Sequence, residues 1–227
     1  AWKAALARRY AAGTVNGKLA ALNTFFTFLG WEECRVKPLR RQRELFRDPG
    51  RELHKGDYLR LLAAAKGAGN WRLYYLMETL ASTGIRVSEV KYLTVEAARA
   101  GRAQVALKGK IRTILIPGKL CRKLLKYAKK QKTASGEIFL TRSGKSMSRR
   151  QIWAEMKSLC RRAGVAASKV FPHNLRHLFA RTFYKACRDV ARLADVLGHS
   201  SMETTRIYLI STGAEYTRQL ERLGLLC

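Results

Sequence analysis

Four short segments of the sequence contain side chains that could bind an anion and act on it chemically. They are TGIRVSE (83 to 89), LKGKIR (107 to 112), PHNLRH (172 to 177) and LGHSSMETTRIY (197 to 208). Together they supply Arg86, Lys108 or Lys110, His173, Arg176, His199 and Tyr208. Guanidinium groups on either side of a phosphate can donate paired hydrogen bonds to its oxygens, in a geometry that lysine cannot match. The set favours a site for an anionic group, with a solvated basic face as the alternative.

Two of these segments place arginines where they could contact one ligand. His173 and Arg176 are three residues apart in a segment with a helical pattern, so they would project from the same face of a helix. Arg86 comes shortly after a glycine, at the predicted start of a new helix. Free backbone N–H groups and the helix dipole at such a start attract an anion.

The segment LGHSS predicts a corner between two helices. Gly198 ends one helix, and Ser200 or Ser201 begins the next. His199 therefore lies where its side chain is exposed, and Tyr208 lies toward the end of the helix that follows. A lone histidine or tyrosine is usually a packing or surface residue. Function is favoured because these residue types occur together, each in a context that exposes it.

Composition and cysteine usage indicate a folded protein without disulfides or a zinc site. The chain has 227 residues, of which 47% are hydrophobic and 9% aromatic, enough for one or two compact domains. No apolar run approaches the roughly 20 residues of a membrane span, and the start of the chain does not resemble a secretory signal. The five cysteines are scattered, with no C-x-x-C pair. A cytoplasmic protein without a membrane partner is expected.

The charge balance indicates a polyanionic partner. Forty-five Lys and Arg against 16 Asp and Glu give a formal net charge of +29, and the basic residues occur in every segment. Proteins that bind membrane surfaces usually concentrate their positive charge in one amphipathic helix or tail. Charge that is spread along the chain favours nucleic acid over phospholipid.

Hydrophobic spacing predicts helices for most of the chain. Residues 2 to 30 read as the last helices of a small helical domain, with a cap at Thr14 or Asn16, and we expect more protein before Ala1. Residues 35 to 51 are rich in Arg and Lys and contain two prolines, which is typical of an extended linker. Farther along, AQVALKGKIRTILIP predicts a β-hairpin among helices. The predicted fold class is mainly α with a small antiparallel β-sheet (α+β).

In these motifs the sequence resembles the tyrosine recombinases, also called phage-type integrases. The motifs are similar first to those of integrases of bacterial mobile elements and next to those of Xer-like recombinases. TGIRVSE resembles the first arginine box of that family, HNLRH its H-x-x-R box, LGHSS its second histidine box and TTRIY its nucleophile box. The resemblance covers roughly residues 52 to 215. It implies a tyrosine recombinase catalytic domain with a C-terminal tail helix (52–227), after a basic linker (35–51) and the C-terminal part of a helical core-binding domain (1–34).

The resemblance also implies a mechanism. Tyr208 would attack a DNA phosphate and displace a 5′-hydroxyl, leaving a 3′-phosphotyrosyl bond, while His173 accepts the tyrosine proton. Three donors would stabilise the charge on the non-bridging oxygens: Arg86, Arg176 and His199. Because the bond energy is kept in the covalent intermediate, neither ATP nor a metal or other cofactor is expected.

The lysine that would protonate the leaving oxygen is assigned less directly. In the family this lysine commonly lies in a G-K-G-x-K-x-R hairpin, whereas this chain has L-K-G-K-I-R and is one residue shorter there. We align Lys108 with the catalytic lysine and keep Lys110 as the alternative.

Four neighbouring residues are predicted to have supporting roles. Glu89, one turn after Arg86, is expected to orient an arginine or cap the backbone. Arg181 and His177 are expected to be structural, and Trp153 is expected to pack in a helix with Ile152 and Met156.

The predicted function is site-specific DNA recombination, in the integration or excision of a mobile element. The alternatives are Xer-like dimer resolution of chromosomes or plasmids, type IB topoisomerase-like relaxation, and a DNA-binding module without catalysis. Double-stranded DNA is the expected partner, in the nucleoid of a bacterial cytoplasm. An accessory directionality factor is a further candidate partner.

The apolar pattern in the tail STGAEYTRQLERLGLLC predicts that the tail docks on a neighbouring protomer in a homo-tetramer on DNA.

Overall fold

The computed structural model describes residues 2–40, 49–107, 110–199, 201–209 and 221–222 of the chain. The chain divides into two compact units, Ala1–Leu45 and Phe46–Cys227, and each is described by itself. The division into domains with separate roles stays a prediction. No helix in the described ranges is long and apolar enough to cross a membrane.

The first unit consists of helices α1 (Trp2–Arg9) and α2 (Ala12–Phe28) and the short 3₁₀ helix η1 (Glu32–Cys34). The predicted cap at Thr14 or Asn16 is wrong, because α2 begins at Ala12 and both residues lie inside it. The Asn16 side chain instead bonds the backbone of Leu39, donating to its carbonyl at 2.9 Å and accepting from its N–H at 2.7 Å. A polar side chain within the helix thus ties the following extended segment to α2.

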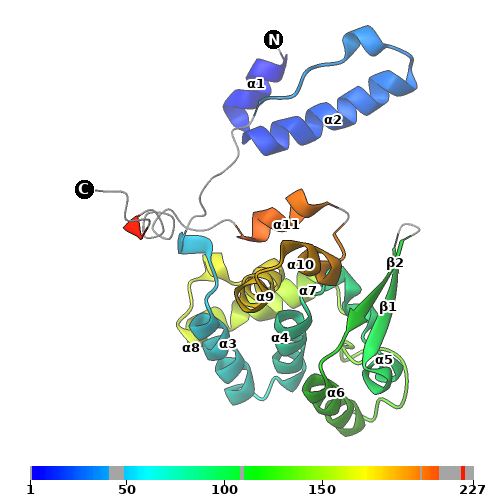
Figure 1. Cartoon of the computed structure of the whole chain (residues 1–227), viewed down its shortest axis with the longest axis vertical. Helices are drawn as coiled ribbons and strands as arrows, with labels where there is room; N and C mark the ends of the chain where they lie inside the picture. The colour runs from blue at the N-terminus through cyan, green and yellow to red at the C-terminus, as the bar shows by residue number, and fades with distance from the viewer. Residues whose placement is uncertain (1, 41–48, 108–109, 200, 210–220, 223–227) are drawn as a thin grey trace. The chain divides into compact units, whose positions relative to one another are not determined.

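The second unit is mainly helical with a two-stranded antiparallel sheet, as predicted (Figure 1). Its α-helices and strands are α3 (Lys55–Gly67), α4 (Trp71–Thr83), α5 (Val95–Ala100), β1 (Arg102–Leu107), β2 (Lys110–Leu115), α6 (Gly118–Lys130), α7 (Arg149–Ser158), α8 (Cys160–Ala163), α9 (Pro172–Cys187), α10 (Val190–Leu197) and α11 (Met202–Leu209). Three 3₁₀ helices accompany them: η2 (Pro49–Arg51), η3 (Val87–Tyr92) and η4 (Ala167–Lys169).

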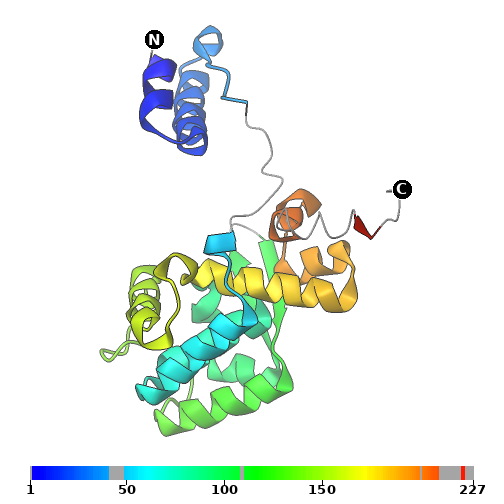
Figure 2. The same cartoon turned by 90° about the vertical axis from the view of Figure 1, so that its left-hand side faces the viewer.

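The main core of this unit surrounds α4. Leu73, Leu76, Met77 and Leu80 of α4 are fully buried and recur with helical spacing. The Asn70 side chain accepts a hydrogen bond from the Leu73 N–H and caps the start of the helix. Helix α9 packs along α4. Both views place α9, α10 and α11 at one end of the unit and α6 at the other (Figure 2).

The hairpin of β1 and β2 has one face in the core and one in solvent. Val105 of β1 pairs with Arg112 of β2. Val105 and Ile114 are buried, whereas Ile111 and Leu115 are exposed. This alternation is typical of a strand covered on one side.

Trp153 was expected to pack with its helical neighbours, and this prediction is wrong. Ile152 and Met156 of α7 are fully buried, but Trp153 is 47% exposed, with the Lys157 ammonium above its ring. Ile152 and Met156 are four residues apart and define the inner face of α7, and Trp153 points off that face.

Candidate active site

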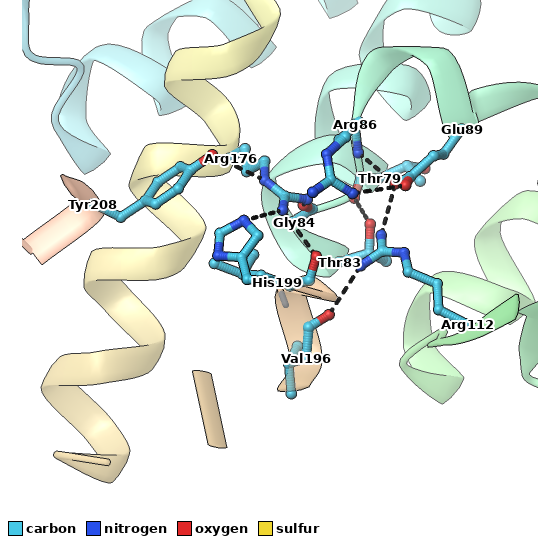
Figure 3. Close-up of polar contacts among 11 residues, drawn as sticks. Thr79, Thr83, Gly84, Arg86, Glu89, Arg112, Arg176, Val196, His199 and Tyr208 are labelled. Carbon is cyan, nitrogen blue, oxygen red and sulfur yellow. Dashed lines mark hydrogen bonds and ion pairs between the residues drawn. The ribbon is translucent and has the colours of Figure 1, made fainter. Parts of the chain in front are cut away.

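The structure brings five of the six predicted site residues together. Arg86 follows α4, His173 and Arg176 lie on α9, His199 follows α10, and Tyr208 lies on α11. Four of them, Arg86, Arg176, His199 and Tyr208, are drawn in Figure 3, where their polar ends converge. Lys108 lies outside the described residues. Lys110 begins β2, and the structure describes only its backbone.

Arg176 is at the centre of this cluster and is almost fully buried, with 1% of its surface exposed. Its guanidinium donates one hydrogen bond from Nη1 to the Gly84 carbonyl. It donates another from Nη2 to the Leu197 carbonyl, at 2.9 Å. Nη2 also lies 2.9 Å from His199 Nε2, and Nε lies 3.3 Å from the Tyr208 hydroxyl. One guanidinium therefore joins the end of α4, the end of α10 and the tyrosine of α11.

Gly84 makes this arrangement sterically possible. It ends α4 with φ of 64°, in the left-handed region that favours glycine. A Cβ atom at this position would lie 2.3 Å from the Phe179 ring of α9. Gly84 is therefore both the end of α4 and a point of close approach between two elements of the site.

Tyr208 is held inside the site of its own chain, with 6% of its surface exposed. Its hydroxyl lies 3.5 Å from His173 Nε2. The Tyr208 ring packs against the rings of His177 and His199, with centroids 4.4 and 5.3 Å away. It also belongs to a small second core with Ala180 of α9 and residues of α10. Burial of the ring fixes where the hydroxyl points.

His199 has a defined hydrogen-bonding state. Its Nε2 faces a guanidinium, which only donates, so Nε2 is the acceptor and the proton of the neutral ring is on Nδ1. Nδ1 lies 2.8 Å from the Thr205 hydroxyl, which then accepts. Burial, and then repulsion by Arg176 and other nearby cations, lowers the pKa of His199 from 6.5 to about 4. The neutral ring is the form that this arrangement favours.

Thr205 is a site residue that the sequence analysis missed. It is fully buried on α11, three residues before Tyr208, so the two side chains lie on the same face of the helix. The TTRIY motif contained the signal, since a threonine one turn before a tyrosine shares its face. Nothing in the sequence, however, placed His199 opposite Thr205.

Arg86 is held by Glu89. The Glu89 carboxylate, 1% exposed, accepts from the Arg86 N–H at 2.8 Å and from Arg86 Nη1 at 3.1 Å. The prediction that Glu89 orients an arginine is confirmed. The prediction that the backbone N–H at this helix start is free to bind an anionic ligand is wrong for Arg86, because this N–H donates to the Glu89 carboxylate. The Arg86 side chain is 41% exposed and so is accessible to a ligand.

The site as a whole gathers positive charge around the buried Arg176. Burial lowers the pKa of Arg176, and repulsion by Arg86 and Arg112 acts in the same direction. A bound anion would relieve this repulsion, so the arrangement is suited to binding one. Within the described ranges, no group of three or more His, Cys, Asp and Glu side chains could hold a metal ion.

The two residues predicted to be structural have structural contacts. Arg181 donates Nη2 to the Leu53 carbonyl at 2.7 Å and pairs with Glu52 through Nη1. His177 is buried, and its ring lies edge-on to the His173 ring, with centroids 4.5 Å apart. Arg181 thus ties α9 to the segment before α3, and His177 supports the rings around Tyr208.

Comparison with known sequences gives one family and several relatives. The phage integrase family matches residues 51–215. A tyrosine recombinase XerC of Roseiflexus castenholzii is 32% identical over 218 residues, covering 88% of this chain and 69% of that protein. A tyrosine recombinase XerA of Pyrococcus furiosus is 29% identical over 234 residues, covering 97% of this chain and 77% of that protein.

Solved structures share the fold at lower identity. The crystal structure of XerA recombinase has a TM-score of 0.65 and 23% identity, covering 100% of this chain and 81% of that one. XerH bound to a palindromic difH substrate, in a post-cleavage complex, has a TM-score of 0.73 and 18% identity. The match covers 98% of this chain and 70% of that one. The Tn1549 transposon integrase with transposon right end DNA has a TM-score of 0.72 and 17% identity. The match covers 98% of this chain and 83% of that one.

Proposed function

This chain belongs to the phage integrase family, the tyrosine recombinases, and from this premise we propose how its site cuts and rejoins DNA strands. The observation that carries the proposal is the Tyr208 hydroxyl, which lies 3.3 Å from Arg176 Nε and 3.5 Å from His173 Nε2. A potential nucleophile, a potential base and a cation that can bind phosphate are thus within reach of one another.

In the proposed reaction the Tyr208 oxygen attacks the scissile phosphorus. The new O–P bond forms as the bond from phosphorus to the 5′ oxygen breaks, which leaves a 3′-phosphotyrosyl link and a free 5′-hydroxyl. Phenols are mostly protonated at neutral pH, so attack requires a proton acceptor. His173 Nε2 accepts that proton. A 5′-hydroxyl from another strand reverses these steps and joins a new partner.

The transition state gathers negative charge on the non-bridging oxygens. Arg86 and Arg176 donate to these oxygens, and each contributes a rate factor of about 10² to 10³, by analogy with a single oxyanion-hole donor. His199 is neutral with Nε2 as acceptor when no phosphate is bound. The incoming negative charge raises the pKa of His199, so that a protonated Nε2 can donate.

The leaving 5′ oxygen needs a proton, which we assign to a lysine of the hairpin between β1 and β2. Lys108 is the first candidate and Lys110 the alternative. Replacing the 5′ oxygen with sulfur, a leaving group that needs no proton, should restore cleavage to the variant that lacks the proton donor. Rescue of Lys110→Ala and not of Lys108→Ala would assign the role to Lys110.

The test of the nucleophile uses Tyr208→Phe, which removes one hydroxyl from a protein of net charge +29 and should preserve DNA binding. With a labelled duplex, wild-type protein should form an adduct that survives denaturing electrophoresis, and Tyr208→Phe should form none. Tyr10→Phe, in the first unit, is the matched control and should form the adduct normally. Adduct formation by Tyr208→Phe at a near-normal rate would reject the assignment.

We propose integration or excision of a mobile element as the biological role, with dimer resolution as the alternative. The resemblance of the four motifs to mobile-element integrases and the fold shared with the Tn1549 integrase support the first role. The sequence similarity to proteins named XerC and XerA supports the second. Joining of two separate duplexes would distinguish either role from topoisomerase-like relaxation. Comparing element-end sites with chromosomal sites as substrates would then separate the two roles.

Assembly and domain roles complete the proposal. Residues 1–34 would bind DNA as part of a core-binding domain, linked by residues 35–51 to the catalytic domain at 52–227. The tail falls almost entirely outside the described residues. We propose that it docks on a neighbouring protomer in a DNA-bound tetramer, with which an accessory directionality factor could cooperate, in the nucleoid. Deleting residues 214 to 227 should preserve half-site binding and abolish cooperative assembly, as measured by gel shift on paired sites.

A further inference from the structure

Arg112 has no part in the proposed chemistry, yet it belongs to the polar network shown in Figure 3, where it joins Glu89 to the Val196 carbonyl. It projects from β2, two residues after Lys110, and its side chain is 17% exposed. Its Nη2 donates to Glu89 Oε2 at 2.6 Å, and its Nη1 lies 3.4 Å from the Val196 carbonyl. In the part of the chain that the structure describes, its buried Nε has no hydrogen-bond partner. Glu89 and Val196 therefore orient this guanidinium.

Arg112 also packs directly against the corner that carries His199. A Cβ atom on Gly198 would lie 2.5 Å from Arg112 Cδ, so the glycine leaves room for the arginine. The hairpin strand, the 3₁₀ helix after Arg86 and the end of α10 thus meet on one side chain. Arg112 therefore couples the positions of these three elements to one another.

Glu89 is shared between two arginines. Its Oε1 accepts from Arg86 Nη1, whereas its Oε2 accepts from the Arg86 N–H and from Arg112 Nη2. A carboxylate and a guanidinium prefer two parallel hydrogen bonds when both oxygens are available. Because Arg112 occupies Oε2, Arg86 keeps a single side-chain bond to Glu89, and the rest of its guanidinium remains accessible.

We propose that Arg112 is a positioning residue for strand cleavage. It holds Glu89 so that Arg86 is presented to the scissile phosphate, and it supports the Gly198 turn that presents His199. Without Arg112, the buried Glu89 carboxylate would draw Arg86 into a two-bond pair and away from the phosphate. This inference rests on the proposed function of Arg86 and goes beyond it, since Arg112 itself does not contact the DNA.

The test compares three scissile groups in single-turnover cleavage by Arg112→Met. A normal phosphodiester should be cut about 10² times more slowly than by wild-type protein, by analogy with loss of one transition-state donor. A methylphosphonate has a methyl group in place of one non-bridging oxygen and carries no charge, so the deficit should shrink at least about tenfold there. With a 5′-thio leaving group, which needs no proton, Arg112→Met should be as much slower than wild-type protein as on the normal substrate. Proton donation by the hairpin lysine is intact in this variant. Arg102→Met, an exposed arginine of β1, is the matched control and should cut all three substrates normally.

The double variant Arg112→Met with Glu89→Gln sharpens the test, because it also removes the charge that would capture Arg86. It should cleave the phosphodiester faster than Arg112→Met alone. A slower double variant would mean that the Glu89 charge supports Arg86 and does not capture it, and an equal loss on all three substrates would mean that Arg112 only stabilises the fold. Either result would overturn the proposal. Rescue by the 5′-thio substrate would mean that Arg112 acts through the hairpin lysine, and would also overturn the proposal. If wild-type protein forms no adduct, the proposed function fails; if wild-type protein and Arg112→Met cleave equally, only this inference fails.

Discussion

The two halves of the candidate site are built on different physical principles. In the nucleophile half, Arg176, Thr205 and Tyr208 are buried. Side-chain contacts join them to His199 and to the exposed His173. The carboxylate half, Arg86, Glu89 and Arg112, is held by one buried carboxylate that two guanidiniums share. Packing therefore fixes the positions of the side chains in the nucleophile half, whereas ion pairs with Glu89 fix them in the carboxylate half. The same type of substitution should have different consequences in each half.

The largest expected effect comes from replacing one arginine in each half with alanine. Arg86→Ala and Arg176→Ala should each slow strand cleavage about 10² to 10³ fold, since each removes one donor to the transition state. Their effects on stability should differ. Arg176→Ala should lower the free energy of unfolding by about 2 kcal/mol or more, because it leaves a cavity and buried carbonyls without a donor. Arg86→Ala, at a half-exposed side chain, should change it little.

Cleavage rates and urea unfolding of the two variants measure this difference. An equal loss of stability in both would mean that burial does not distinguish the two halves.

Much of the nucleophile half could be predicted from the sequence, because its signals are local. The spacing of His173 and Arg176 puts them on one helical face, and Gly198 marks the corner that carries His199. The carboxylate half was predicted only in part. Glu89 lies one turn from Arg86 and was recognised, whereas Arg112 depends on a hairpin docking against η3 and α10. Thr205 was missed for a similar reason, since its partner lies on another element.

The second prediction concerns Gly84, where the two halves meet. Gly84→Ala combines an unfavourable φ of 64° with a Cβ placed 2.3 Å from the Phe179 ring. Gly101→Ala is the matched control, because Gly101 has a similar φ of 68° and no atom within 4 Å of its Cβ position. The control should lose about 1 kcal/mol of unfolding free energy from the backbone alone. Gly84→Ala should lose clearly more, and equal losses in chemical denaturation would show that the contact with Phe179 does not constrain the site.

The smallest expected effect is a pH dependence that belongs to the nucleophile half. The pKa of His199 is lowered to about 4 in the folded chain, from 6.5. The unfolded chain then binds this proton more readily, so the stability present above about pH 6.5 is lost progressively as the pH falls toward 4. His199→Gln should flatten this part of the stability curve, measured without DNA. The same slope in both proteins would show that His199 is not the group responsible.

The central claim is that Tyr208, positioned within its own chain by Arg176 and His173, is the residue that becomes linked to DNA. The most direct measurement is to trap wild-type protein on a nicked duplex, digest the complex with trypsin and nuclease, and locate the remaining nucleotide by mass spectrometry. Cleavage after Arg206 and Arg218 releases the peptide IYLISTGAEYTR, which contains both Tyr208 and Tyr216. Fragmentation of that peptide should place the nucleotide, through its 3′-phosphate, on Tyr208. A nucleotide on Tyr216, or on any other residue, would contradict the account.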